Sequence, residues 1–148
     1  SALIDVYNKR EQLSALINRK LYIIADGGIS KTGDCVKSLC FADMVMCGNL
    51  FAGVLETPGD ILTIDGRNYK EYQGSSTHKA NHIEGVSALV AVKGSYDEVL
   101  SKLLQGISSG CSYQGVRNLI DLRKDPEFIK ITRAGLKESH PHDIHKIV

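Results

Sequence analysis

Two short apolar runs of the sequence each end in a turn whose residue types suit anion binding. The runs are residues 21–25 and 44–47, and the turns that follow them contain Asp26, Gly27, Gly28, Gly48 and Asn49. Glycine lets backbone N–H groups approach an anion, and the start of a following helix adds partial positive charge. The two turns could together hold one phosphate, with Asp26 accepting hydrogen bonds from sugar hydroxyls. The alternative is that these glycines only make tight turns.

A second group of candidate residues follows further along the chain. Tyr72 carries a hydroxyl that can donate to a phosphate, and Gly74 with Ser75 can approach a planar base. Glu84 could transfer a proton or accept a hydrogen bond from a base N–H. Taken singly, a tyrosine in a hairpin is also typical of packing, and a loop glutamate is typical of a solvated surface.

The elements before residue 50 alternate between helix and strand. Apolar spacings of three and four predict a helix over residues 2–20, and a second helix is expected over 35–40. The continuous apolar runs at 21–25 and 44–47 are typical of strands buried on both faces of a parallel sheet. In such α/β folds the loops after the strands share one edge, where ligands bind.

The pattern then changes to antiparallel strands and a long helix. A hairpin is predicted around Asp65-Gly66, between residues 61–64 and 68–72, followed by a polar loop at 73–85 and a strand at 86–92. Ser95 and Glu98 have the spacing of a capping box that opens a helix. Beyond it we expect a helix over about 114–124, a short strand at 128–132 and a polar tail from Arg133.

Composition excludes several classes of protein. The 148 residues carry a formal charge of +1, with 43% hydrophobic and 24% charged residues. These proportions suit a soluble globular domain and argue against a basic nucleic-acid surface. No apolar run is long enough to span a membrane. Reduced, buried thiols are expected of the four cysteines, Cys35, Cys40, Cys47 and Cys111, which favours an intracellular, cytoplasmic protein. From the charge balance and the apolar runs we expect no nucleic-acid and no membrane partner.

An ordered set of motifs resembles the IMP dehydrogenase and GMP reductase family. The set covers nearly the whole chain, and its members are IADGGI at 24–29, GD at 33–34, MCGNLFAG at 46–53, ETPG at 56–59, YK at 69–70, YQG at 72–74, EG at 84–85, KG at 93–94, GISS at 106–109 and ESHPHD at 138–143.

The resemblance implies that residues 1–148 are the C-terminal part of one catalytic (β/α)8 TIM-barrel domain. The chain would supply the last two barrel strands with their helices, plus a hairpin and flap insertion at about 61–92. The earlier strands, and the loop with the nucleophilic cysteine, would be absent, since none of the four cysteines matches that motif. The remainder of its own barrel would be a partner, within a homotetramer or octamer.

The resemblance also implies roles for individual residues. The ribose would be bound by Asp26, and the phosphate by Gly27, Gly28, Gly48, Asn49 and Tyr72. The purine base would lie against Gly74 and Ser75, with Glu84 as the catalytic glutamate that contacts it. Backbone carbonyls of Glu138, Ser139 and His140 would bind potassium in the neighbouring subunit.

The sequence leaves two reactions open and favours GMP reductase. The loop at 73–85 is short and the sequence has no Arg-Tyr pair. In both respects the chain resembles the reductases, which need no such pair because they do not activate a hydrolytic water. We therefore predict NADPH-dependent deamination of GMP to IMP and ammonia. The alternative is IMP dehydrogenase with NAD, which the residues at 135–143 favour, and a flap segment left out between Asn81 and His82 would remove the loop argument. An alternative of another class is a non-catalytic nucleotide-binding or assembly fragment.

Overall fold

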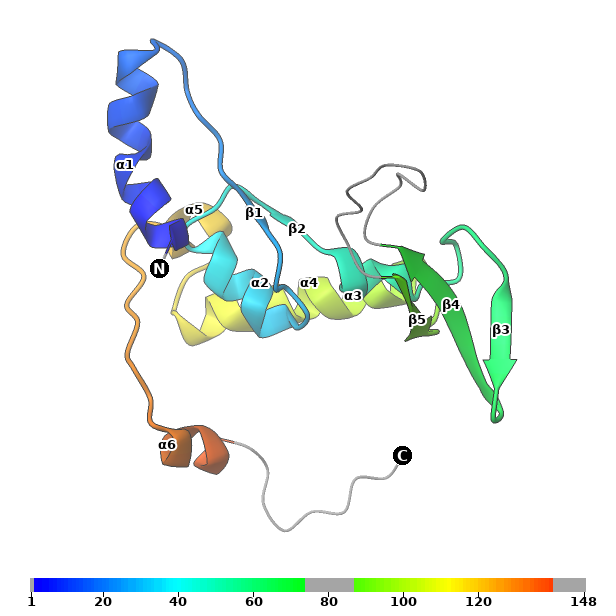
Figure 1. The fold of residues 1–148 in the computed structure, drawn as a ribbon. Coiled ribbons are helices and arrows are strands. Elements are labelled where there is room, and N and C mark those ends of the chain that lie inside the picture. The colour runs from blue at the N-terminus through cyan, green and yellow to red at the C-terminus, as the bar shows by residue number, and fades with distance from the viewer. Residues whose placement is uncertain (1, 74–86, 140–148) are drawn as a thin grey trace.

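The computed structural model describes residues 2–73 and 87–139 (Figure 1). The helices in this part of the chain are α1 (Ala2–Leu16), α2 (Thr32–Leu39), α3 (Gly48–Ala52), α4 (Tyr96–Tyr113), α5 (Leu119–Leu122) and α6 (Arg133–Glu138). The strands are β1 (Ile24–Asp26), β2 (Met44–Met46), β3 (Ile61–Ile64), β4 (Arg67–Gln73) and β5 (Ser87–Ala91). Their order confirms the predicted α/β class.

Strands β1 and β2 lie side by side and run parallel, connected by α2. Ile24 pairs with Met44 and Asp26 pairs with Met46, so both strands end at the same edge. This is the strand–helix–strand unit from which parallel sheets are built. In the described residues the sheet has these two strands alone, so a closed barrel stays a prediction.

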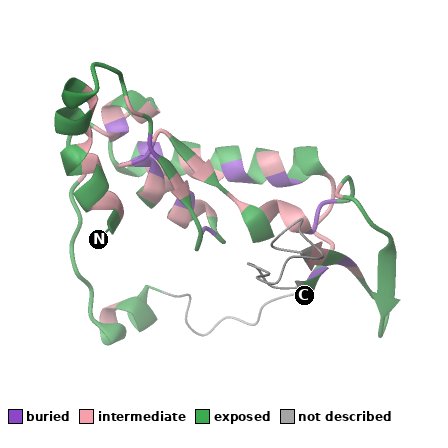
Figure 2. Cartoon of the chain, turned by 45° about the horizontal axis from the view of Figure 1, so that its top comes forward, coloured by how far each residue is buried: buried purple, intermediate pink, exposed green. Residues whose placement is uncertain are grey.

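The core lies between the β1–β2 pair and the helices α2 and α4 (Figure 2). Two glycines of α4 allow this close packing, because a Cβ at Gly106 would overlap the side chain of Thr32, and one at Gly110 would overlap Val36. The small residues therefore let α4 lie directly against α2. The buried residues of the two clusters are Ile29, Cys35, Leu103, Cys40, Cys111 and Leu122.

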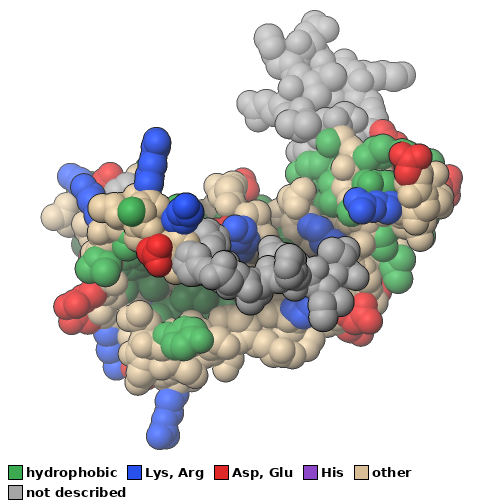
Figure 3. Space-filling view, turned by 90° about the horizontal axis from the view of Figure 1, so that it is seen from below, with side chains coloured by type: hydrophobic (Ala, Val, Ile, Leu, Met, Phe, Trp, Pro, Cys, Tyr) green, Lys and Arg blue, Asp and Glu red, His purple; other side chains and the backbone are tan. Residues whose placement is uncertain are grey.

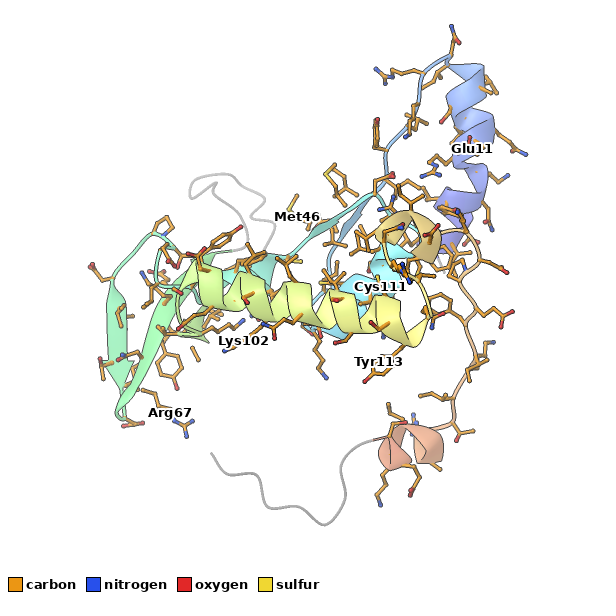
Figure 4. All side chains as sticks on the ribbon, turned by 180° about the vertical axis from the view of Figure 1, so that it is seen from behind. Glu11, Met46, Arg67, Lys102, Cys111 and Tyr113 are labelled. Carbon is orange, nitrogen blue, oxygen red and sulfur yellow. The ribbon has the colours of Figure 1, made fainter. Side chains whose placement is uncertain are left out.

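The prediction that both strands are buried on two faces is wrong for the described structure. Ile24, Met44 and Met46 are 51%, 51% and 53% exposed, whereas Ala25 and Val45 pack against the core. Successive side chains of a strand point to opposite faces, so α2 and α4 cover one face only. Figure 4 shows Met46 projecting from the open face, away from α4.

Strands β3, β4 and β5 form a separate antiparallel sheet that projects beside α3 (Figure 1). The predicted hairpin is confirmed: Asp65 and Gly66 have φ values of 49° and 74°, as a two-residue turn with both central residues left-handed requires. β5 pairs along β4 on the other side from β3. The sheet occupies the range predicted for the insertion, and its role as a flap stays a prediction.

The predictions for the C-terminal part are mostly wrong. Instead of a helix over 114–124 only α5 forms, because Gly115, with φ of 67°, ends the preceding helix. Residues 128–132 are exposed and form no strand, since no described strand lies beside them to pair with. The tail contains the unpredicted α6, whose first turn is capped by the Thr132 hydroxyl accepting from the Gly135 N–H at 3.0 Å.

Two surface properties bear on possible partners. Among the described residues, none of the helices combines the length and the apolar character needed to cross a membrane. On the face shown in Figure 3, basic and acidic side chains are interspersed rather than separated by sign.

Candidate functional site

The two predicted turns meet at the shared edge of β1 and β2. We call residues 26–30 the first turn and residues 48–49 the second turn. Between them lies a pocket of about 450 Å³, which we call the two-turn pocket. The structure therefore brings together six of the residues predicted to bind a nucleotide, namely Asp26, Gly27, Gly28, Gly48, Asn49 and Tyr72. Ile29, Ser30 and Met46 complete the lining.

The first turn has a backbone conformation that glycine adopts readily. Gly27 and Gly28 have φ values of 91° and 74°, in the left-handed region that strains residues with a Cβ. A Cβ at either position would meet no protein atom within 4 Å. The requirement for glycine is therefore conformational, and the space above the turn is open to a ligand.

A carboxylate of the next helix anchors the far end of the first turn. Asp34 Oδ2 accepts hydrogen bonds from the backbone N–H groups of Ser30 and Lys31 at 3.3 and 3.1 Å. Burial raises the pKa of the Asp34 carboxyl, but these hydrogen bonds and the nearby Lys37 ammonium outweigh it, so the pKa lies below its usual value. Asp34 is therefore ionised near neutral pH and holds the turn against the start of α2.

Asp26 offers an acceptor to the pocket. Its side chain is exposed, and within residues 2–73 and 87–139 its carboxylate forms no hydrogen bond or ion pair. An ionised carboxylate is an acceptor only, so this group can accept from hydroxyl or N–H donors of a ligand.

Contacts from other parts of the chain fix the second turn. The Tyr72 hydroxyl of β4 lies 2.9 Å from the position that a Cβ would take at Gly48, so glycine lets the tyrosine approach without a shift of its side chain. The Lys93 ammonium donates to the backbone carbonyl of Asn49 at 2.5 Å and to its side-chain Oδ1 at 3.1 Å. Burial lowers the pKa of Lys93.

No role was predicted for Lys93, which contacts the second turn without lining the two-turn pocket. The signal available there was only the Lys-Gly pair at 93–94 in the ordered set of motifs. Its contact with Asn49 spans 44 residues, and no local pattern predicts such a contact.

Several predicted site residues do not join the two-turn pocket. Gly74, Ser75, Glu84 and His140 lie outside the described residues. Glu138 is the last residue of α6, and Ser139 follows it. This helix lies apart from β1 and β2 (Figure 1). Their predicted potassium site stays a prediction.

The four cysteines do not line the pocket. All are free, and the Cys35 and Cys47 sulfur atoms are 4.0 Å apart beneath the second turn. Burial, together with the neighbouring Cys47 thiol, raises the pKa of Cys35 to about 11. Because only a thiolate is strongly nucleophilic, Cys35 is unsuited to attack a substrate at neutral pH. That the nucleophile lies outside these four cysteines stays a prediction.

Comparisons with known proteins give one consistent result. A family model described as "IMP dehydrogenase / GMP reductase domain" matches residues 2–142. The chain is 40% identical over 144 residues to an inosine-5'-monophosphate dehydrogenase of Chlorobaculum parvum, covering 82% of this chain and 29% of that protein. It is 35% identical over 167 residues to the inosine-5'-monophosphate dehydrogenase of Borreliella burgdorferi, covering 99% of this chain and 40% of that protein.

The chain covers only part of the length of these relatives. The chain spans less than half of each of these relatives. The Borreliella alignment runs over 167 positions, which is more than the 148 residues of the chain. Within the matched region that relative therefore has residues with no counterpart here.

Proposed function

This chain belongs to the IMP dehydrogenase / GMP reductase family, and we propose that it supplies the nucleotide-phosphate pocket of an IMP dehydrogenase. The observation that carries the proposal is the convergence of the two glycine turns and Tyr72 on one pocket. The reaction would be oxidation of IMP to XMP, with NAD as the hydride acceptor. The chain's own share is to bind and orient the nucleotide.

The choice of dehydrogenase over reductase corrects the preference drawn from the sequence. GMP reductase was favoured by the short loop at 73–85. Relatives with 35% to 40% identity carry the name inosine-5'-monophosphate dehydrogenase, which supports the alternative instead. NAD accordingly replaces NADPH in the proposal.

The two turns offer donors for a phosphate and an acceptor for a ribose. Backbone N–H groups of the glycines and the Asn49 amide can donate to phosphate oxygens, and the Tyr72 hydroxyl reaches the same space. Asp26 can accept from the ribose hydroxyls. Each of these hydrogen bonds would be stronger than one between two neutral groups, because the phosphate acceptor is charged.

The rest of the reaction lies beyond the two-turn pocket. We propose that Gly74 and Ser75 hold the base and that Glu84 takes part in proton transfer, as the family resemblance implies. The nicotinamide cofactor, when bound, supplies the hydride acceptor. The remaining barrel strands, the tetramer or octamer and a potassium site at Glu138, Ser139 and His140 belong to the same proposal for the whole protein.

The decisive experiment uses the complete protein that contains these residues. IMP with NAD and, separately, GMP with NADPH are incubated with it, and absorbance at 340 nm is followed. The proposal predicts a rise with the first pair and no change with the second. A fall with GMP and NADPH alone would restore the reductase. Tight IMP binding without turnover of either pair would favour the non-catalytic nucleotide-binding fragment.

A further inference from the structure

We propose that Lys93 is a positioning residue, which sets the Asn49 side chain to donate to the phosphate of the bound nucleotide. The inference rests on the proposed function, because it concerns the same pocket. It adds a residue outside both turns and gives it a role through Asn49.

The orientation of the Asn49 amide follows from what Lys93 can donate. A lysine ammonium has three donors and no acceptor, so the Asn49 atom that faces it must be the carbonyl oxygen. The Nζ–Oδ1 distance is 3.1 Å. The amide nitrogen, with its two donors, is then left for the pocket that Asn49 lines. Without Lys93 either end of the amide could face the pocket, and the oxygen would repel a phosphate.

The backbone of the second turn is held by the same ammonium. Lys93 Nζ donates to the Asn49 carbonyl at 2.5 Å and lies 3.5 Å from the carbonyl oxygen of Leu50. These two carbonyls belong to α3, which has only five residues, so most of its backbone groups lie near a helix end. Lys93 therefore fixes both the main chain and the side chain at Asn49.

Lys93 itself is anchored on α3 through its main chain. Its N–H donates to the Gly53 carbonyl at 2.8 Å, and the Leu55 N–H donates to the Gly94 carbonyl at 3.0 Å. A Cβ at Gly53 would overlap the Ala91 carbonyl oxygen, so the strand exit and the end of α3 are in close contact. The lysine side chain therefore starts from a fixed point.

The charge of Lys93 is available to an anion. Its side chain contacts carbonyl and amide oxygens, and no carboxylate of the described residues forms an ion pair with it. Partial burial reduces screening of this charge by water. We expect this charge to attract a phosphate in the two-turn pocket, which Asn49 lines.

The test compares a ligand with a phosphate and one without it. In the complete protein, Lys93→Met should weaken IMP binding about tenfold, the range expected for a lost hydrogen bond to a charged group. Inosine, which lacks the phosphate, should bind with unchanged affinity. In turnover the KM for IMP should rise while kcat stays within about twofold. Calorimetry gives both affinities, and Lys102→Met on the exposed face of α4 (Figure 4) is the control.

Two further variants test whether Lys93 acts through Asn49. Asn49→Ala should weaken IMP binding, and Lys93→Met added to it should cause little further loss, because contacting residues are not additive. Lys93→Gln, which keeps a donor without the charge, replaces Lys93→Met if that variant does not fold.

Unchanged IMP affinity in Lys93→Met, equal losses for IMP and inosine, or fully additive effects would each overturn the positioning role. Wild-type protein that binds IMP no better than inosine would instead overturn the proposed phosphate pocket itself.

Discussion

The two turns of the pocket are held in different ways. In the first turn the anchor is local: Asp34 accepts from the N–H groups of Ser30 and Lys31, four and three residues before it. In the second turn the anchors are remote, since Tyr72 comes from β4 and Lys93 lies 44 residues further along the chain. The first turn therefore depends on a side chain within a few residues of it, and the second depends on the β3–β4–β5 sheet and on Lys93, which follows β5.

This difference predicts which parts of the molecule a substitution in each turn affects. A change in the first turn should affect ligand binding without disturbing the sheet. A change in the sheet should reach the pocket through the second turn. Four substitutions, in decreasing order of expected effect, test the comparison.

The largest effect is expected from Gly27→Val. A β-branched residue at a φ of 91° is strained by about 1–3 kcal/mol, and its side chain would occupy the space where a ligand sits. IMP affinity should fall about a hundredfold or more. Calorimetry on the complete protein measures it.

Gly59→Val is the matched control for that substitution. Gly59 also has a φ of 91° with no atom within 4 Å of a Cβ, and it does not line the pocket. The two variants should lose similar thermal stability, while only Gly27→Val loses IMP affinity. Equal affinity losses would show that the first turn acts through stability and not through contact with the ligand.

Asp26→Ala should have the next largest effect. Removing the acceptor would leave ribose hydroxyls unpaired in the pocket, so IMP affinity should fall about tenfold. Asp26→Asn keeps one acceptor oxygen and should lose less. Wild-type affinity in the alanine variant would remove Asp26 from the proposed ribose site.

A smaller effect is expected from Gly48→Ala, and it should depend on Tyr72. The added methyl group would lie 2.9 Å from the tyrosine hydroxyl, which is the far end of a side chain that can shift. IMP affinity should fall about fivefold. In a Tyr72→Phe background the hydroxyl is gone, so the same substitution should be nearly neutral. Equal losses in both backgrounds would mean that Tyr72 does not set the shape of the second turn.

The smallest effect concerns the local anchor and appears only in acid. Because the pKa of Asp34 in the folded protein lies below its usual value, its ionised form stabilises the fold above about pH 3.8. That stability is lost as the pH falls through the lowered pKa. Asp34→Asn should therefore flatten the decline in the urea midpoint below pH 4. If the urea midpoint of this variant declines below pH 4 as steeply as in the wild type, carboxylates other than Asp34 cause the decline.

The comparison also explains which parts of the molecule could be predicted from the sequence. The Asp65-Gly66 hairpin and the capping box of Ser95 and Glu98 were predicted and are confirmed, because each is encoded within a few residues. The glycines of the first turn belong to the same class. The family resemblance was confirmed because its motifs occur in a fixed order along the chain.

The predictions failed where distant contacts decide the structure. Residues 128–132 have the composition of a strand, but a strand needs a partner, and none lies beside them in the described structure. The helix predicted over about 114–124 includes Gly115, whose left-handed conformation does not fit a helix. The role of Lys93 depends on the contact between the end of β5 and the end of α3, which no short sequence pattern predicts.

The contact between Lys93 and Asn49 also has a consequence for biosynthesis. A ribosome makes the first turn, and Asp34 that anchors it, long before it adds Lys93. The second turn therefore lacks this contact until 44 more residues have been joined to Asn49 and the intervening segment has brought Lys93 back to it. During translation the chain can form the first turn of the two-turn pocket before the second turn has its contact with Lys93, so nascent chains stalled before residue 93 would carry an incomplete pocket.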